Sequence, residues 1–166
     1  RSEANMKHHD DDHQHAHGRA GSLTRSAVQA TLHCLTGCAI GEVLGMVLAT
    51  ALGWGNTASI AISIALAFVF GYAFTIRAVL RAGVGLRRAV GVALASDTVS
   101  ISTMEIIDNA FILLVPGALA AGLSDGLFWW SLAIGLVIAF VATVPVNRWL
   151  ISRGRGHAVM HEVHAH

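Results

Sequence analysis

Four long apolar segments constrain this chain more than any other feature of its sequence. They cover residues 27–54, 58–80, 88–116 and 127–150. A helix rises about 1.5 Å per residue, so about 20 helical residues cross a hydrocarbon core of about 30 Å. Each segment is long enough, and only 13% of the 166 residues are charged, too few to cover a soluble domain. We therefore predict an all-α integral membrane bundle of four transmembrane helices.

The basic residues fall on one side of this predicted topology. With four spans, the N-terminal tail, the middle loop and the C-terminal tail share one side, and that side holds all 11 Lys and Arg residues. The two opposite loops, residues 53–57 and 117–126, hold none. Because cytoplasmic loops of membrane proteins are enriched in Lys and Arg, we predict that both termini are cytoplasmic.

Two polar, His-rich tails flank the predicted transmembrane domain of residues 26–152. The first tail, residues 1–25, has too little apolar area to fold alone, so we expect it to be flexible. The second covers residues 153–166. Short His-rich tracts bind transition metals with low affinity, so we interpret both tails as a cytoplasmic metal reservoir. The tail histidines that carry this interpretation are His8, His9, His13, His15, His17, His157 and His161.

The first span contains an unusual stretch at residues 33–42, which reads HCLTGCAIGE. Residues four apart stack along one face of a helix, so Cys34, Cys38 and Glu42 share a ridge. Thiolate ligands favour Cu(I), and a mixed set of thiolate, imidazole and carboxylate also suits Zn(II). The alternative is that each cysteine is a small packing residue. Two cysteines on one helix cannot complete a metal site, so further ligands must come from another helix.

A neighbouring ridge of the same span carries small residues at the same spacing. Gly37, Gly41 and Gly45 form a repeated small-xxx-small pattern, which lets another helix approach the backbone closely. We interpret these glycines as structural. The helix that they seat belongs either to this chain or to a partner.

The third span carries three acidic residues, Asp97, Glu105 and Asp108. A carboxyl group near the bilayer centre costs about 2.5 to 3.5 kcal/mol on the insertion scale, so it usually faces a partner or water. Met104 adds a thioether, a soft ligand for Cu(I). The alternative is a buried hydrogen-bonded network of neutral carboxyl groups that fixes the register of the helices.

The first and third spans run in the same direction, so the depths of their residues can be compared. Counted from the predicted entry points, Cys34 and Asp97 lie roughly 10 to 12 Å deep. Glu42 and Glu105 lie roughly 22 to 24 Å deep by the same count. We therefore expect a ladder of polar groups between these spans, which is typical of an ion path. The second and fourth spans have few polar residues and are predicted to be scaffold.

These patterns predict a membrane-embedded transition-metal-binding protein that serves metal transport or delivery, with copper as the first choice and zinc as the second. Two alternatives stay open: an accessory subunit of a larger membrane metalloenzyme or transport complex, and an oligomeric proton or cation channel. The expected partners are the lipid bilayer, the metal ion, and copies of this chain or such a complex. No motif for nucleic acids or for hydrolytic catalysis occurs, so an enzyme is disfavoured. The predicted metal ligands are His33, Cys34, Cys38, Glu42, Asp97, Met104, Glu105 and Asp108.

Three motifs together resemble a family of small bacterial and archaeal membrane proteins that share a domain of unknown function. The motifs are HCLTGCAIGE at residues 33–42, ASDTVSISTMEIIDN at residues 95–109, and PVNRWLISRGRGHA at residues 145–158. The resemblance covers about residues 25–160 of the chain. It implies four helices in the cytoplasmic (inner) membrane of a bacterium or an archaeon, and it implies no activity. Its members occur in association with copper-handling systems, which agrees with copper as the first choice.

Overall fold

The computed structural model describes residues 2–153, with side chains from residue 21 onward. Its elements are α1 (Ser2–Ala51), α2 (Asn56–Arg81), α3 (Leu86–Leu114), the short 3-10 helix η1 (Ala118–Ala120) and α4 (Gly126–Ser152). The described part of the chain contains no strand. All four α-helices are long and apolar enough to cross a membrane, and α3 is the least apolar of them. The predicted all-α bundle of four spans is therefore confirmed, and the chain is a multi-pass membrane protein.

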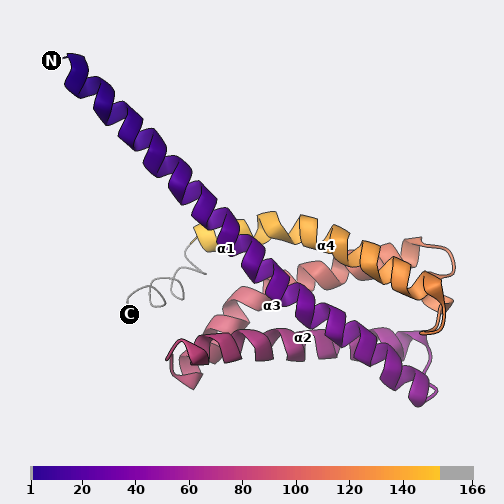
Figure 1. Ribbon diagram of the computed structural model, residues 1–166. Coiled ribbons are helices and arrows are strands. Elements are labelled where there is room, and N and C mark those ends of the chain that lie inside the picture. Colours follow the sequence, from indigo (N-terminus) through magenta and orange to yellow (C-terminus); the bar gives the residue numbers. More distant parts are fainter. Residues whose placement is uncertain (1, 154–166) are drawn as a thin grey trace.

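α1 is much longer than the span it contains. It begins at Ser2, whereas its apolar part starts near Gly21. Figure 1 shows the first half of the helix extending away from the bundle. This part of α1 is continuous with the span, and the flexibility of the tail stays a prediction. Extending an existing helix costs little, because each added residue brings its own hydrogen bond. The tail histidine side chains lie outside the described residues, so the metal reservoir stays a prediction.

The helices pass up and down the bundle and meet at two ends (Figure 1). We call the end with the α2–α3 turn and the last residue of α4 the tail end, and the end with the α1–α2 and α3–α4 connections the loop end. A glycine with positive φ lies in each connection: Gly53 at 66°, Gly83 at 83° and Gly117 at 83°. Glycine adopts this left-handed conformation without the steric cost that a Cβ brings. The three connections therefore reverse the chain sharply.

α1 packs more extensively on α2 than on any other helix. Gly37, Gly41 and Gly45 all face α2. A Cβ at Gly37 would lie 2.8 Å from the Cα of Gly71, and one at Gly41 would lie 2.6 Å from the Cα of Ala67. The two backbones touch, as the small-residue pattern predicts. Because α2 fills this glycine stripe, the stripe is closed to a helix from another protein.

Candidate functional site

The polar residues that we predicted on α1 and α3 lie along the contact between these helices, but not in one site. They form three groups, one near the tail end, one at the middle of the bundle and one near the loop end. Among the residues described with side chains, no three His, Cys, Asp or Glu residues gather closely enough to hold a metal ion. Any metal site in this region must therefore use other ligands as well, and Met104 offers one at the middle of the bundle.

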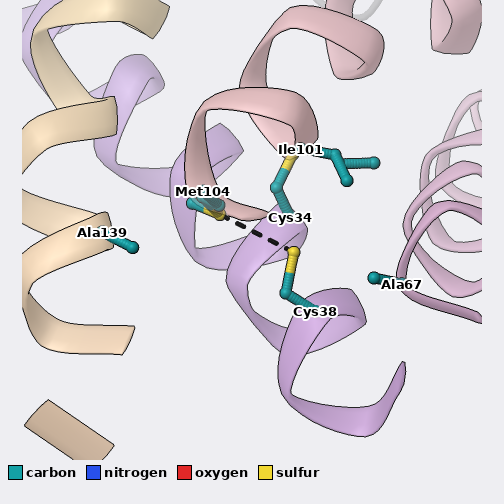
Figure 2. Close-up of a cluster of buried hydrophobic side chains, with 6 residues drawn as sticks. All are labelled: Cys34, Cys38, Ala67, Ile101, Met104 and Ala139. Atoms are coloured by element: carbon teal, nitrogen blue, oxygen red, sulfur yellow. Dashed lines mark hydrogen bonds between the residues drawn. The ribbon is translucent and has the colours of Figure 1, made fainter. Parts of the chain in front are cut away.

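The middle group is built from sulfur. The Cys38 thiol donates a hydrogen bond to the thioether of Met104, with the two sulfur atoms 4.0 Å apart. Both side chains are almost fully buried, and Cys34 belongs to the same buried cluster. Figure 2 shows the Cys38 sulfur pointing from α1 toward Met104 on α3, while the Cys34 sulfur lies beside Ile101. We call Cys34, Cys38 and Met104 the sulfur layer.

A carboxyl group adjoins this layer. Glu105, the neighbour of Met104 in the chain, is buried on α3. The side-chain amide of Asn109 donates to Glu105 Oε2 over 3.3 Å, which orients the carboxyl group. The other carboxyl oxygen, Oε1, is buried and has no hydrogen-bond partner. One oxygen of Glu105 is therefore left free to accept a hydrogen bond or a proton.

A cavity of about 270 Å³ lies at the tail end and is lined in part by His33, Cys34 and Asp97. The hydroxyl of Ser96 donates to Asp97 Oδ1 over 2.8 Å. His33 packs edge-on against the ring of Phe74 on α2, with ring centroids 5.9 Å apart. The cavity thus brings Cys34 and Asp97 to a common wall, as the depth comparison predicted. His33 lies at this cavity, away from the Cys38–Met104 contact.

Asn147 connects three helices beside this cavity. Its amide nitrogen donates to the Thr31 hydroxyl on α1 over 2.8 Å, and its amide oxygen accepts a hydrogen bond from Ser100 on α3. The prediction that α4 is plain scaffold misses this residue. The signal was present in the sequence, because an amide inside an apolar span is costly unless it is hydrogen bonded. Asn147 fixes the tail end of α1, α3 and α4 relative to one another.

A smaller cavity, of about 60 Å³, lies at the loop end and is lined in part by Glu42 and Asp108. Neither oxygen of either carboxyl group has a hydrogen-bond partner. Gly135 on α4 makes room for Asp108, because a Cβ at this glycine would collide with Asp108 Oδ1. The two carboxyl groups line the same cavity, and no hydrogen bond joins them. They form an acidic pair, which we call the loop-end pair.

The loop-end pair corrects one detail of the predicted ladder. The depth comparison placed Glu42 level with Glu105, whereas the structure brings Glu42 to Asp108, about one turn further along α3. The estimate assumed that both helices run parallel to the membrane normal. Between the tail-end and loop-end contacts, from Asp97 to Asp108, α3 uses about one turn more than α1 does from Cys34 to Glu42.

Comparison with known proteins identifies the family. The family model described as Domain of unknown function (DUF4396) matches residues 24–156, which include the apolar parts of all four α-helices. No curated protein and no solved structure matches the chain. The predicted resemblance to a family with a domain of unknown function is confirmed: the chain belongs to the DUF4396 family.

Proposed function

We propose that this DUF4396 protein binds a soft transition-metal ion at the sulfur layer, inside the membrane, and serves the transport or delivery of that ion. Cu(I) is the first candidate and Zn(II) the second. The observation that carries the proposal is the buried contact between Cys38 and Met104 on two different spans. Thiolate and thioether sulfur are the protein ligands that select Cu(I).

The spacing of the two sulfur atoms suits a bound metal. Metal–sulfur bonds to thiolate are about 2.3 Å long. In a trigonal site, with angles of about 120°, two such bonds hold their sulfur atoms about 4.0 Å apart. Cys38 Sγ and Met104 Sδ are 4.0 Å apart. A metal ion could therefore take the place of the thiol hydrogen with little movement of the backbone, and Cys34, one turn away on α1, is the nearest further thiol.

Metal binding by Cys38 requires loss of the thiol proton, because the thiolate is the ligand. Glu105 is the proposed acceptor of that proton, because it follows Met104 in the chain, is buried and has one carboxyl oxygen without a partner. In this proposal Cys38 and Met104 are ligands, Cys34 is a third ligand, and Glu105 is the proton acceptor.

The position of the sulfur layer supports a role in moving the ion. Cys34 lines the tail-end cavity, and Glu42, one turn beyond Cys38, lines the loop-end cavity. Cys38 and Met104 line neither cavity and pack in the buried cluster with Ile101. A soft-metal site in the partition between two cavities can exchange its ion with one side at a time, as a carrier must.

We further propose that the tail end faces the cytoplasm, in the inner membrane of a bacterium or an archaeon. All basic residues of the chain lie in the tails, in the α2–α3 turn or near the helix ends beside them, and the two loop-end connections contain none. The positive-inside rule then places both tails in the cytoplasm. The His-rich tails would gather metal on the side from which the larger cavity is entered.

The sharpest test is Cu(I) binding to the full chain in lipid nanodiscs, measured by competition with a Cu(I) chelator. X-ray absorption at the copper edge separates sulfur ligands from the nitrogen ligands of the tails. We expect sulfur-bound Cu(I) in the wild type, and its loss in the double variant Cys34→Ser with Cys38→Ser. Met104→Leu should weaken binding, whereas Met46→Leu, a matched methionine on α1, should not. Full retention of sulfur-bound copper in the double variant would refute the proposal.

An oligomeric proton or cation channel is the second candidate, and the unpartnered loop-end pair favours it. Measurement of ion flux in proteoliposomes distinguishes the channel from the metal carrier. Cu(I) movement that disappears in Cys38→Ser supports the metal carrier. Cation flux that survives Cys38→Ser and disappears in Glu105→Gln supports the channel.

A further inference from the structure

The loop-end pair is the largest unsatisfied polar group of the described bundle. Glu42 is 8% exposed and Asp108 is 1% exposed, and all four carboxyl oxygens lack a hydrogen-bond partner. Ionised carboxylates only accept hydrogen bonds, so these two groups could satisfy each other only if one of them held a proton. An isolated buried carboxylate is strongly disfavoured unless a partner compensates its charge. Something other than the described side chains must fill this role.

No Lys or Arg side chain among the described residues lies at the loop end. The connections at residues 52–55 and 115–125 contain no Lys, Arg or His. The basic residues nearest in sequence to the pair within α1 and α3 are Arg25 and Arg88, more than four helical turns away from Glu42 and Asp108. The charge of the pair is therefore removed either by a proton, which neutralises a carboxyl group, or by a small cation from outside the chain.

The remaining polar lining of the cavity is suited to a cation. Ser59, Ser63 and Ser131 line it together with the pair. Each of these hydroxyls already donates its hydrogen to a backbone carbonyl: Ser59 to Gly55, Ser63 to Glu42, and Ser131 to Leu127 and Phe128. A hydroxyl whose hydrogen is committed in this way has only its oxygen lone pairs left to offer. The cavity thus offers oxygen acceptors, the ligands that hard cations prefer.

The size of the cavity fits an ion that keeps part of its hydration shell. One water molecule needs about 10 to 15 Å³ of cavity volume. The cavity of about 60 Å³ therefore has room for an ion and a few waters. Gly135 determines the position of Asp108, because its missing side chain leaves the space that the carboxyl group occupies.

We propose that the loop-end cavity binds a hard divalent cation of the Ca²⁺ or Mg²⁺ class through Glu42 and Asp108. Two carboxylates balance the charge of one divalent ion, and carboxylate, hydroxyl and water oxygens complete its shell. This site is separate from the sulfur layer and does not depend on metal binding there. It differs from that layer in ligand chemistry, because oxygen ligands select hard ions and sulfur ligands select soft ones.

Equilibrium binding of radioactive Ca²⁺ to the full chain in nanodiscs tests this proposal. Ca²⁺ is the probe because the tail histidines, as nitrogen ligands, do not suit it, and the tail carboxylates Asp10, Asp11 and Asp12 are the same in every variant compared. We expect Glu42→Gln and Asp108→Asn each to weaken the site by about tenfold or more, since each removes one charged ligand. Asp125→Asn, which removes an acidic group of the α3–α4 connection, is the matched control and should bind as the wild type does. Equal Ca²⁺ binding in all four proteins would overturn the proposal.

A second pair of variants tests the geometry without changing a charge. Gly135→Ala places a Cβ against the Asp108 carboxyl and should weaken Ca²⁺ binding. Gly126→Ala, in the same helix, meets open space and should leave it unchanged. Cys38→Ser separates the two sites: it should lose sulfur-bound Cu(I) and keep wild-type Ca²⁺ affinity. Loss of Ca²⁺ binding in a folded Cys38→Ser protein would contradict a separate site.

Discussion

Two stripes run side by side along α1, and the bundle uses them in opposite ways. The glycine stripe, Gly37, Gly41 and Gly45, touches α2 backbone to backbone. The second stripe, Cys34, Cys38 and Glu42, carries reactive groups toward α3, and we call it the ligand stripe. It borders a cavity at each end and includes a carboxyl group without a hydrogen-bond partner.

This difference separates the residues that stabilise the bundle from the residues that could bind an ion. Close backbone packing is a main source of stability in membrane bundles, where lipid is as apolar as the side chains. A buried, unpartnered carboxyl group has the reverse effect, since it costs stability and persists where function requires it. Substitutions in the glycine stripe should therefore change stability, and substitutions in the ligand stripe should change binding.

The largest effect is expected from Gly41→Ala. The added Cβ would lie 2.6 Å from the Cα of Ala67, and backbone atoms cannot rotate away as a side chain can. Overpacking of this kind costs about 1 to 3 kcal/mol, and we expect the upper end. The measurement is the free energy of unfolding in mixed micelles titrated with SDS, followed by circular dichroism.

Gly91→Ala is the control for this substitution, because a Cβ at Gly91 of α3 meets open space. It should leave stability unchanged or raise it slightly, since alanine favours helix more than glycine does. If Gly41→Ala and Gly91→Ala unfold alike, the glycine stripe does not hold the bundle together.

A bound metal should make the ligand stripe contribute to stability. At a free Cu(I) concentration about 100 times the dissociation constant, binding to the native state alone adds about 2.7 kcal/mol. The same unfolding titration, with and without buffered Cu(I), measures this. The Cys38→Ser variant should gain much less stability from Cu(I) than the wild type does. A wild type whose unfolding does not respond to Cu(I) would contradict the proposed sulfur site.

The spans and the ligand stripe were predictable from sequence because they depend on local regularities. Apolar length predicted all four spans, and α3, expected over residues 88–116, is Leu86–Leu114. The i, i+4 rule put Cys34, Cys38 and Glu42 on one ridge. Helical spacing likewise identified Met104 as a candidate ligand, and it lies against Cys38.

The remaining features depend on how helices cross, which no single segment encodes. Glu42 and Asp108 line one cavity because of how α1 and α3 are aligned along each other, which neither segment encodes alone. The two cavities are what remains after the side chains of all four helices have packed. Asn147 was missed because one amide in an apolar span has no periodic partner, and its bonds to Thr31 and Ser100 connect different helices.

Glu42→Gln, in the ligand stripe, should raise the stability of the bundle, whereas Gly41→Ala, in the glycine stripe, should lower it. In the presence of a chelator, it removes one unpartnered buried carboxyl group, and we expect stability to rise by about 1 kcal/mol. Saturating Ca²⁺ should reverse the order, because only the wild type keeps both carboxylates. SDS titration of both proteins, with EDTA or with Ca²⁺, tests this. A Gln variant that is less stable than the wild type in EDTA would mean that Glu42 has a structural partner.

Thr31→Val should give the smallest change in stability. It tests whether the side of α1 that carries the ligand stripe also makes a structural contact. Thr31 is fully buried near Cys34, and its hydroxyl accepts the hydrogen bond of Asn147 while donating to the Ala27 carbonyl. Hydrogen bonds between membrane helices contribute about 0.6 kcal/mol on average, so the variant should lose about that much stability. Sulfur-bound Cu(I) should be unchanged, because valine preserves the shape of the threonine side chain. Thr31→Val could instead weaken Cu(I) binding with no loss of stability. That result would mean that the Asn147 contact positions the sulfur layer. The glycine stripe and the ligand stripe would then not divide stability from binding at the tail end of α1.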